Sequence, residues 1–371
     1  MIYFDNSATS YPKPLGVYLK AIEAQFLYSF NSGRGGYSQC IRAGEKIYEV
    51  REKAARMFNL EASGVVFTKN CTEALNIAIK GSVKQGDHIL MSSLEHNSVS
   101  RVVNNLGNEY DIFDYDNNDD KTVESLTAKI KENTRVVVCT HASNVFGCVL
   151  PIRRIGAICK SRGITFIVDA AQTAGTLGID MQQDNIDILC TAGHKGLIGT
   201  MGTGLLMLKN ADIKPLLYGG TGSNSFDLTQ PTDKPEGFEA GTLNNGGILS
   251  LGAGIDYINN NGISNICNHE MELCKYLYGE LESNPDVTLY TPQPENGKSV
   301  AIISFNFADY ASEKTAAILA DNGICTRAGY HCAPLAHKHF GTAERGTVRI
   351  SLGAFNKPEQ CVKLVETLNS I

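Results

Sequence analysis

Short apolar runs rich in β-branched residues recur through the first two thirds of this chain, separated by stretches with helical spacing. This alternation restricts the possible folds more than any other feature of the sequence. The runs occupy residues 64–68, 88–93, 111–115, 135–141, 164–170, 186–192 and 204–209. Residues 47–57, 74–79 and 123–130 instead place apolar side chains three and four positions apart, as in helices. Because strand and helix alternate, we expect an α/β fold whose mostly parallel sheet is covered by helices on both faces.

The pattern changes after about Gly247. Two helices, two strands and a final helix are expected there, at residues 249–258, 267–283, 299–307, 347–352 and after Asn356. They predict a smaller α+β domain made of residues 1–15 and 248–371, beside a large α/β domain at 16–247. The Pro-, Asp- and Gly-rich stretch from Asp227 to Gly237 is long and irregular, which is typical of a functional loop.

Composition and charge narrow the possible partners. The chain has 371 residues, 43% of them hydrophobic and 19% charged, enough for one large core or two unequal domains. Its net charge is −6 with both signs interspersed, so no like-charged block offers a surface for nucleic acid or an anionic membrane. The sequence "MIYFDNSATS" does not have a basic segment followed by an apolar one, and no apolar run approaches the roughly 18 residues of a membrane span. We therefore expect a cytoplasmic protein. Its partner should be a small molecule or another protein.

Eleven cysteines are scattered without C-x-x-C pairs or clustered histidines. This spacing argues against a disulfide framework and against a structural zinc site, so we expect no metal. Most of these cysteines should be small buried hydrophobic side chains.

Five residues with chemically useful side chains follow predicted strands, namely Thr72, His96, Asn144, Asp169 and Lys195. In an open parallel sheet, ligands bind beyond the carboxyl ends of the strands, so these positions are candidates for a site. Each also has an ordinary structural interpretation. Thr72 and Asp169 could cap helices or turns, His96 could be a hydrogen-bonded core residue, and Lys195 could be a surface residue in a turn.

Taken together, the five residues suit pyridoxal phosphate. A helix that begins at Cys71 and Thr72 offers backbone N–H groups to a phosphate. An acid at strand depth can hold a ring nitrogen protonated, an imidazole can stack on the ring, and a lysine can bind the cofactor covalently. Nucleotide motifs compete poorly, because the glycines of 199–204 are in the wrong order for G-x-G-x-x-G and no P-loop pattern occurs.

Nine segments distributed over nearly the whole chain carry a resemblance to a known family. They are "YFDNSATSYPKP", "NCTEALN", "LEHNSVS", "HASNVFG", "VDAAQTAGT", "AGHKG", "FEAGTLNNGGILSLG", "RAGYHCAPL" and "TVRISLGAFN". With these segments in this order, the chain resembles pyridoxal-phosphate-dependent cysteine desulfurases with the class V aminotransferase fold (fold type I), of the group II, SUF-type branch.

The resemblance implies a role for each residue around the cofactor ring. Lys195 would form the covalent bond to the cofactor, and Asp169 would pair with the pyridine nitrogen. His96 would stack on the ring and move protons. Asn144 and Gln172 would donate hydrogen bonds to the phenolic oxygen.

The resemblance also implies how the phosphate is held. Cys71 and Thr72 at the helix start, with His194, would bind it from one subunit, and Thr242 would reach it from a second subunit. The active protein would therefore be a homodimer. Ala192 departs from the family pattern, because many relatives have a hydroxyl there for the phosphate.

On the substrate side, Arg349 matches the arginine that binds the substrate carboxylate, a bidentate task that suits arginine better than lysine. Arg327 matches a second arginine near the sulfur-transfer loop, and Asn144 would contact the substrate as well. Cys332 matches the nucleophile, although Tyr330 replaces the first of two histidines that usually precede it.

The implied reaction converts L-cysteine to L-alanine, with Lys195 or His96 as the base and a persulfide formed on Cys332 for delivery to an acceptor protein. Two alternatives stay open at this point. A selenocysteine lyase could use the same residues, and a catalytically silent relative could bind the cofactor as a scaffold.

Overall fold

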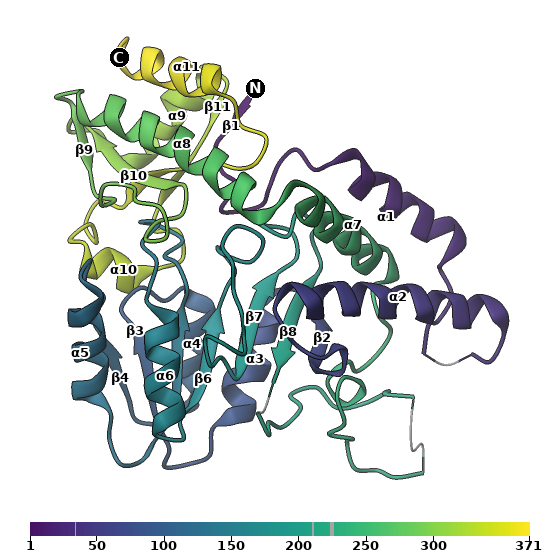
Figure 1. The fold of residues 1–371 in the computed structure, drawn as a ribbon. Helices are drawn as coiled ribbons and strands as arrows, with labels where there is room; N and C mark the ends of the chain where they lie inside the picture. Colours follow the sequence, from purple (N-terminus) through teal and green to yellow (C-terminus); the bar gives the residue numbers. More distant parts are fainter. Residues whose placement is uncertain (34, 210, 223–225) are drawn as a thin grey trace.

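A central seven-stranded sheet organises the protein, which we describe from a computed structural model of residues 1–33, 35–209, 211–222 and 226–371 (Figure 1). Its strand order is β2-β8-β7-β6-β5-β3-β4. The strands are β2 Val65–Thr68, β3 His88–Ser92, β4 Tyr110–Phe113, β5 Thr134–Thr140, β6 Thr165–Asp169, β7 Ile188–Ala192 and β8 Gly204–Leu208. Each lies within two residues of its predicted position.

Strand directions confirm the predicted fold class. Strands β4, β3, β5, β6 and β7 run parallel, and only β8 runs antiparallel to its neighbours β2 and β7. Alternate side chains of β5 enter two different cores: Val137 and Cys139 enter one, Val136 and Val138 the other. This two-sided burial explains why the strands read as continuous apolar runs.

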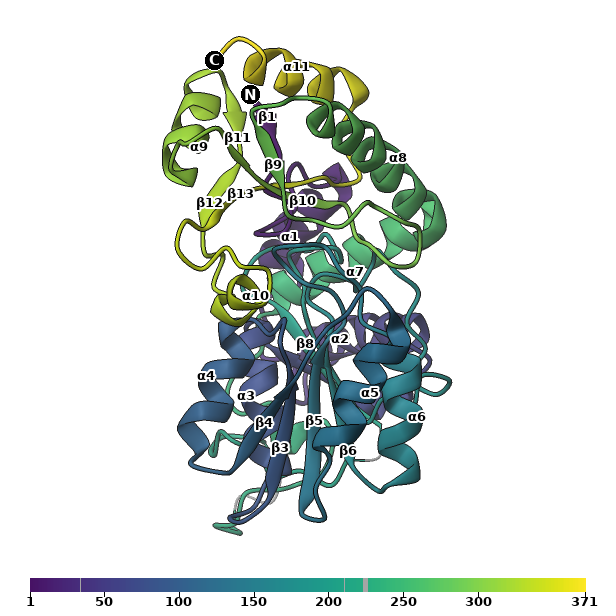
Figure 2. The ribbon, with the colours of Figure 1, turned by 90° about the vertical axis from the view of Figure 1, so that its left-hand side faces the viewer.

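Helices cover both faces of this sheet, as Figure 2 shows. On one face lie α3 (Cys71–Ser82) and α4 (Asn97–Leu106), and on the other lie α5 (Asp119–Lys129) and α6 (Ile152–Ser161). Three further helices lie beside the sheet, where α7 (Asn245–Asn261) packs against both α1 (Leu15–Leu27) and α2 (Ser38–Met57). The predicted helix at 249–258 is thus part of α7, which begins earlier because the Asn244 side chain caps it by accepting from the Gly247 N–H at 3.0 Å.

A second sheet is antiparallel, with strand order β12-β13-β10-β9. Its strands are β12 Arg327–Gly329, β13 Thr347–Ser351, β10 Ile302–Phe307 and β9 Val287–Leu289. The helices of this region are α8 Ile263–Glu282, α9 Ser312–Asp321, α10 Pro334–His339 and α11 Pro358–Leu368. The predicted strands at 299–307 and 347–352 and helices at 267–283 and after Asn356 are confirmed, whereas β9 and β12 were not predicted.

The N-terminus joins this second region. Strand β1 (Ile2–Tyr3) pairs in parallel with β11 (Ile324–Cys325), and Phe4 is buried in the core of the small sheet. Both chain ends therefore lie near each other in Figure 1. The exact domain boundaries at residues 15 and 247 stay a prediction.

The long connection after β8 is irregular, as predicted for 227–237. Its described part contains one short 3-10 helix at Glu236–Phe238, and another, Ala62–Gly64, precedes β2. Across the described residues, no helix has the length and apolar character needed to span a membrane.

Candidate active site

All five strand-end residues meet at one cavity of about 100 Å³ at the carboxyl edge of the central sheet. Its walls are formed by Asn70, Cys71, Thr72, His96, Ser98, Thr140, Asn144, Asp169, Ala171, Gln172, Ala192, His194 and Lys195. The sheet produces this convergence, because β3, β5, β6 and β7 are parallel and end at the same edge. The structure thus brings together eight residues that the sequence predicted around a cofactor.

The N-terminus of α3 forms one wall. Its cap is Asn70, whose side chain accepts from the Glu73 N–H at 2.9 Å, so the interpretation of Thr72 as the cap is wrong. The reason is that the helix begins at Cys71, two residues earlier than a cap at Thr72 would require. The N–H groups of Cys71 and Thr72 have no hydrogen-bond acceptor among the residues that the structure describes. Two donors and the helix dipole are therefore available to an anion.

Asp169, at the end of β6, is buried. One of its oxygens accepts from the Ala171 N–H at 2.9 Å and from the Cys71 thiol at 3.5 Å. Burial raises the pKa of Asp169, and these donors and the charge of Lys195 oppose that shift. A cation placed against this carboxylate would be strongly favoured.

Lys195 faces Asp169 across the same cavity. Burial lowers the pKa of its ammonium group, Asp169 raises it, and Arg349 and Arg327 lower it further. A lowered pKa increases the fraction of neutral amine, which is the form that attacks a carbonyl or accepts a proton.

His96 is the N-cap of α4, a role that was not predicted from the sequence. Its Nδ1 accepts from the Ser98 backbone N–H at 3.1 Å. Burial lowers the pKa of His96 to about 4, and the nearby Lys195 adds to the shift. Since Nδ1 is an acceptor, the neutral ring carries its proton on Nε2.

Two buried polar atoms at the cavity lack hydrogen-bond partners within the described residues, Asn144 Oδ1 and His194 Nδ1. Burial also lowers the pKa of His194 to about 4. Orphaned polar groups are costly, so their presence fits a site built around a polar ligand. Together with the free N–H groups of α3, they fit pyridoxal phosphate.

Cys332 lies on a tight turn between β12 and α10. His331 and Cys332 have φ values of 49° and 58°, and the Ala333 N–H closes the turn onto the Tyr330 carbonyl at 2.9 Å. Positive φ costs non-glycine residues energy, on the order of 1 kcal/mol each, so the turn needs outside support. It is held by α4 and by the segment after β5, because the Asn97 N–H donates to the Cys332 carbonyl at 2.7 Å and Asn144 Nδ2 donates to the His331 carbonyl at 2.8 Å.

All eleven cysteines lie in the described part of the chain, and Cys332 is the one that is exposed. Burial raises the pKa of most of the others, including Cys71, Cys139 and Cys190, and so keeps them as thiols. Their expected role as buried filler is confirmed for those eight that are fully buried; Cys267 and Cys325 are half-buried.

Arg349, on β13, is only 1% exposed and already has partners. Nη1 donates to the Asn144 carbonyl at 2.8 Å, and Nη2 donates to Asp5 Oδ1 at 2.6 Å. Arg327 is the cross-strand neighbour of Arg349, and no hydrogen bond or ion pair joins its side chain to any residue described. No role was expected for Asp5 from the sequence, although it lies in the segment "YFDNSATSYPKP" that carries the family resemblance.

Thr242 is exposed and does not line the cavity of Lys195. It borders a neighbouring hollow that also includes Asn70 and His194. Its contribution from a second subunit stays a prediction.

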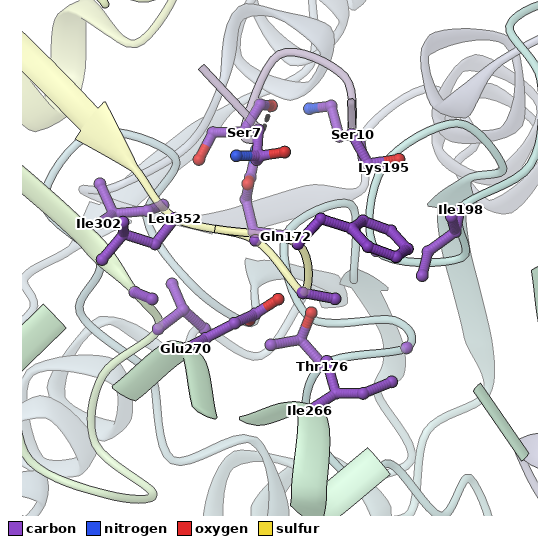
Figure 3. A pocket seen from close by; sticks show the side chains of 18 of the residues that line it. Ser7, Ser10, Gln172, Thr176, Lys195, Ile198, Ile266, Glu270, Ile302 and Leu352 are labelled. Atoms are coloured by element: carbon purple, nitrogen blue, oxygen red, sulfur yellow. Dashed lines mark hydrogen bonds between the residues drawn. The ribbon is translucent and has the colours of Figure 1, made fainter. Parts of the chain in front are cut away.

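A smaller pocket of about 60 Å³ lies on the other side of Lys195, between the two sheets (Figure 3). Here Gln172 Nε2 donates to the Ser7 carbonyl at 3.2 Å, which ties the N-terminal segment to the site. Glu270 of α8 points into this pocket, 7% exposed, and burial raises its pKa to about 8. The position of Glu270 could not be predicted from the sequence, because this residue lies in an ordinary amphipathic helix.

Comparisons with known proteins agree with this geometry. The profile of the family described as Aminotransferase class-V matches residues 2–364. A probable cysteine desulfurase of Methanothermobacter thermautotrophicus is 35% identical, over 100% of this chain and 94% of the relative. The apo structure of a cysteine desulfurase from Thermococcus onnurineus NA1 superposes with a TM-score of 0.91 at 32% identity, covering 100% of this chain and 94% of that one.

A second solved structure, the cysteine desulfurase CsdA of Escherichia coli with an S-sulfonic acid, gives a TM-score of 0.88 at 26% identity, over 99% of this chain and 94% of that one. Sequence and fold therefore match over nearly the full length of the chain. The chain belongs to the class V aminotransferase family.

Proposed function

We propose that this protein is a pyridoxal-phosphate-dependent cysteine desulfurase, which converts L-cysteine to L-alanine and keeps the sulfur as a persulfide on Cys332. One observation carries the proposal. The exposed Cys332 lies on a turn whose carbonyls accept from Asn97 and Asn144, and Asn144 also lines the cavity of Lys195 and Asp169, so the backbone of this turn is fixed beside that cavity. The names of the relatives point to the same activity.

The residues around the larger cavity would hold the cofactor. The α3 N–H groups, Thr72 and His194 would bind the phosphate, Asp169 the pyridine nitrogen, and Gln172 and Asn144 the phenolic oxygen through N–H groups that remain unused. When bound, pyridoxal phosphate supplies an electron sink for the substrate's α-carbon.

Lys195 Nζ is the better candidate for the base that takes the α-proton. Its lowered pKa favours the neutral amine. His96, by contrast, uses Nδ1 as a cap acceptor and carries a proton on Nε2, so its ring can stack and donate but has no free lone pair toward the cavity.

Cys332 Sγ then takes the sulfur atom. As a thiolate it attacks the sulfur of the bound substrate, a sulfur–sulfur bond forms, the carbon–sulfur bond breaks, and the electron pair of that bond stays with the three-carbon fragment, which leaves as L-alanine after protonation. Exposure of the turn leaves the persulfide open to an acceptor protein.

A homodimer would complete the site, with the partner supplying its own copy of Thr242. Support comes from α1, whose outer side chains are largely exposed although apolar: Leu15 (71%), Ile22 (56%) and Phe26 (81%). Such a face favours association with another protein surface. Sedimentation of the cofactor-loaded protein measures this, and a fully active monomer would contradict it.

The alternatives are not favoured. A selenocysteine lyase would not need the supported Cys332 turn, and the relatives are named for the cysteine reaction. A silent scaffold would not need Lys195, Asp169 and Cys332 all in place.

The test is a pulse of L-cysteine followed by mass spectrometry. We expect a sulfur-mass increase on the peptide with Cys332, together with alanine release. Cys332→Ala should still bind cofactor and cysteine but lose both products, whereas Cys267→Ala, at a half-buried cysteine of α8, should keep both. Alanine release that persists in Cys332→Ala would refute the assigned nucleophile.

A further inference from the structure

Asp5 and Arg349 form an ion pair at the predicted carboxylate site, 344 residues apart in sequence and 2.6 Å apart between Oδ1 and Nη2. The backbone of Asp5 is fixed, because it bridges to Ser351 and its carbonyl accepts from the Ala8 N–H at 3.0 Å. The Asp5 side chain has no other hydrogen bond within the described chain, so it can rotate without moving the backbone.

The guanidinium has little free surface for a ligand. Nη1 is bonded to the Asn144 carbonyl, and Nε is buried without a partner among the described residues. Arg349 is 1% exposed, whereas Asp5 is 20% exposed. A carboxylate that arrives from solution therefore reaches Arg349 most directly at the position that the Asp5 carboxylate occupies.

Charge leads to the same conclusion. The pair is neutral, and a substrate carboxylate added to the intact pair would place two negative groups on one buried guanidinium, where their repulsion is weakly screened. Exchange of one carboxylate for the other keeps the buried charge balanced.

We propose that Asp5 is an internal competitor for the substrate carboxylate. Its side chain occupies Arg349 in the ligand-free protein and leaves when an amino acid binds, so the strength of this pair sets the affinity for α-carboxylates. The inference rests on the proposed function, which makes Arg349 the carboxylate site.

The exchange affects only ligands that carry a carboxylate. An amine without one does not have to displace Asp5, so the pair lowers the affinity for α-carboxylates and leaves the affinity for such amines unchanged. The exchange also takes place near the catalytic lysine, because Ser7 and Ser10, just after Asp5, line the pocket with Lys195 and Gln172 (Figure 3).

The first test uses protein freed of cofactor and acetate as the probe. Asp5→Asn leaves Arg349 buried and unpaired, so its melting temperature should fall and acetate should restore most of the loss. Asp5→Ser, which leaves more room for the probe, should behave in the same way. Wild type should respond much less to acetate, because acetate must first displace Asp5. The matched control is Asp184→Asn, since Asp184 pairs at 2.9 Å with Arg153, whose side chain is 66% exposed and stays hydrated; it should not be rescued by acetate.

Absence of acetate rescue in both Asp5 variants would overturn the inference, and so would an equal response in wild type. If neither variant folds in plain buffer, refolding in acetate decides: recovery supports the exchange, and no recovery contradicts it. A carboxylate that docks on Arg327 instead would leave the variants without rescue.

The second test measures affinity for L-alanine in cofactor-loaded protein by calorimetry. Asp5→Asn should bind L-alanine about tenfold more tightly than wild type, with cysteamine, which lacks the carboxylate, bound equally by both. Equal or weaker L-alanine binding would mean that Asp5 only orients Arg349. Acetate rescue needs no cofactor, so it separates this inference from the desulfurase assignment, which fails only if wild type makes no alanine from L-cysteine.

Discussion

Burial moves the pKa values of Lys195, His96 and Asp169 toward the uncharged form of each group. Each shift has the same origin, the cost of a charge in a cavity that water enters poorly. A neutral lysine can attack a carbonyl carbon, and a neutral histidine can stack on a ring. The buried aspartate, whose charged form is disfavoured by burial, would be stabilised by a cationic ring nitrogen. At the scale of single residues, the cavity is prepared for a ligand that brings its own charges.

His96 provides a direct check of this view. We expect its imidazole to stay neutral from about pH 8 down to about pH 5, with the proton on Nε2, because its pKa lies near 4 and Nδ1 accepts from Ser98. Nuclear magnetic resonance of isotope-labelled histidine reports both properties. His96→Asn, which keeps a capping side chain, identifies the resonance. Titration near the ordinary value of 6.5 would contradict the prediction.

At the scale of elements, helix starts and turns place the reactive groups. The sequence predicted a helix start at Cys71 and Thr72, just before the apolar spacing of residues 74–79, but it did not identify Asn70 as the cap. The family resemblance assigned Cys332 as the nucleophile, but the two residues at positive φ could not be predicted. Neither is glycine, and the supporting hydrogen bonds come from Asn97 and Asn144, far away in sequence.

Asn70→Ala tests the α3 start. Loss of the cap should lower the free energy of unfolding by about 1 kcal/mol, and it should also weaken cofactor binding, because the N–H groups beside it lose their fixed direction. Asn118→Ala is the matched control, since Asn118 caps α5 by accepting from the Asp120 N–H at 2.9 Å, away from the cavity. Urea unfolding should show a similar loss of stability in both variants. Measurements of cofactor dissociation should show weaker binding only in Asn70→Ala.

At the scale of the whole molecule, the two sheets meet around a pocket that contains the carboxyl group of Glu270. Its pKa is raised by burial from 4.5 to about 8, so the folded protein holds a proton there that the unfolded chain releases. Because the pKa of this acid is higher in the folded state than in the unfolded state, its contribution to the free energy of unfolding is highest below about pH 4.5. That contribution decreases as the pH rises toward 8.

Glu270→Gln removes this dependence. We expect the variant to gain stability over wild type progressively from about pH 4.5 to about pH 8, by on the order of 4 kcal/mol at the upper end, with little difference at lower pH. Glu272→Gln, at an exposed position two residues along α8, should show no such trend. Parallel pH profiles for wild type and Glu270→Gln in thermal or urea unfolding would contradict the assignment.

Most of the large sheet could be predicted, because its buried strands are five or so residues long and read as apolar runs. Strands β1, β9, β11 and β12 could not, since two or three residues carry no periodicity. The same limit applies to the site. Residues at strand ends, such as Asp169 and Lys195, are found by topology, whereas Asp5 acquires its role only by contact with Arg349 across the chain.

The pairing of Ile2 with Ile324 and of Asp5 with Arg349 has a consequence for synthesis on the ribosome. Strands β2 to β8 are complete once residue 208 has emerged, so the large sheet can begin to form while translation continues. The first few residues, by contrast, must wait for nearly the last ones, and contacts of such long sequence separation form late. The nascent chain can therefore form the strand ends that carry Asp169 and Lys195 first. The Asp5–Arg349 pair can form only after β13 has left the exit tunnel.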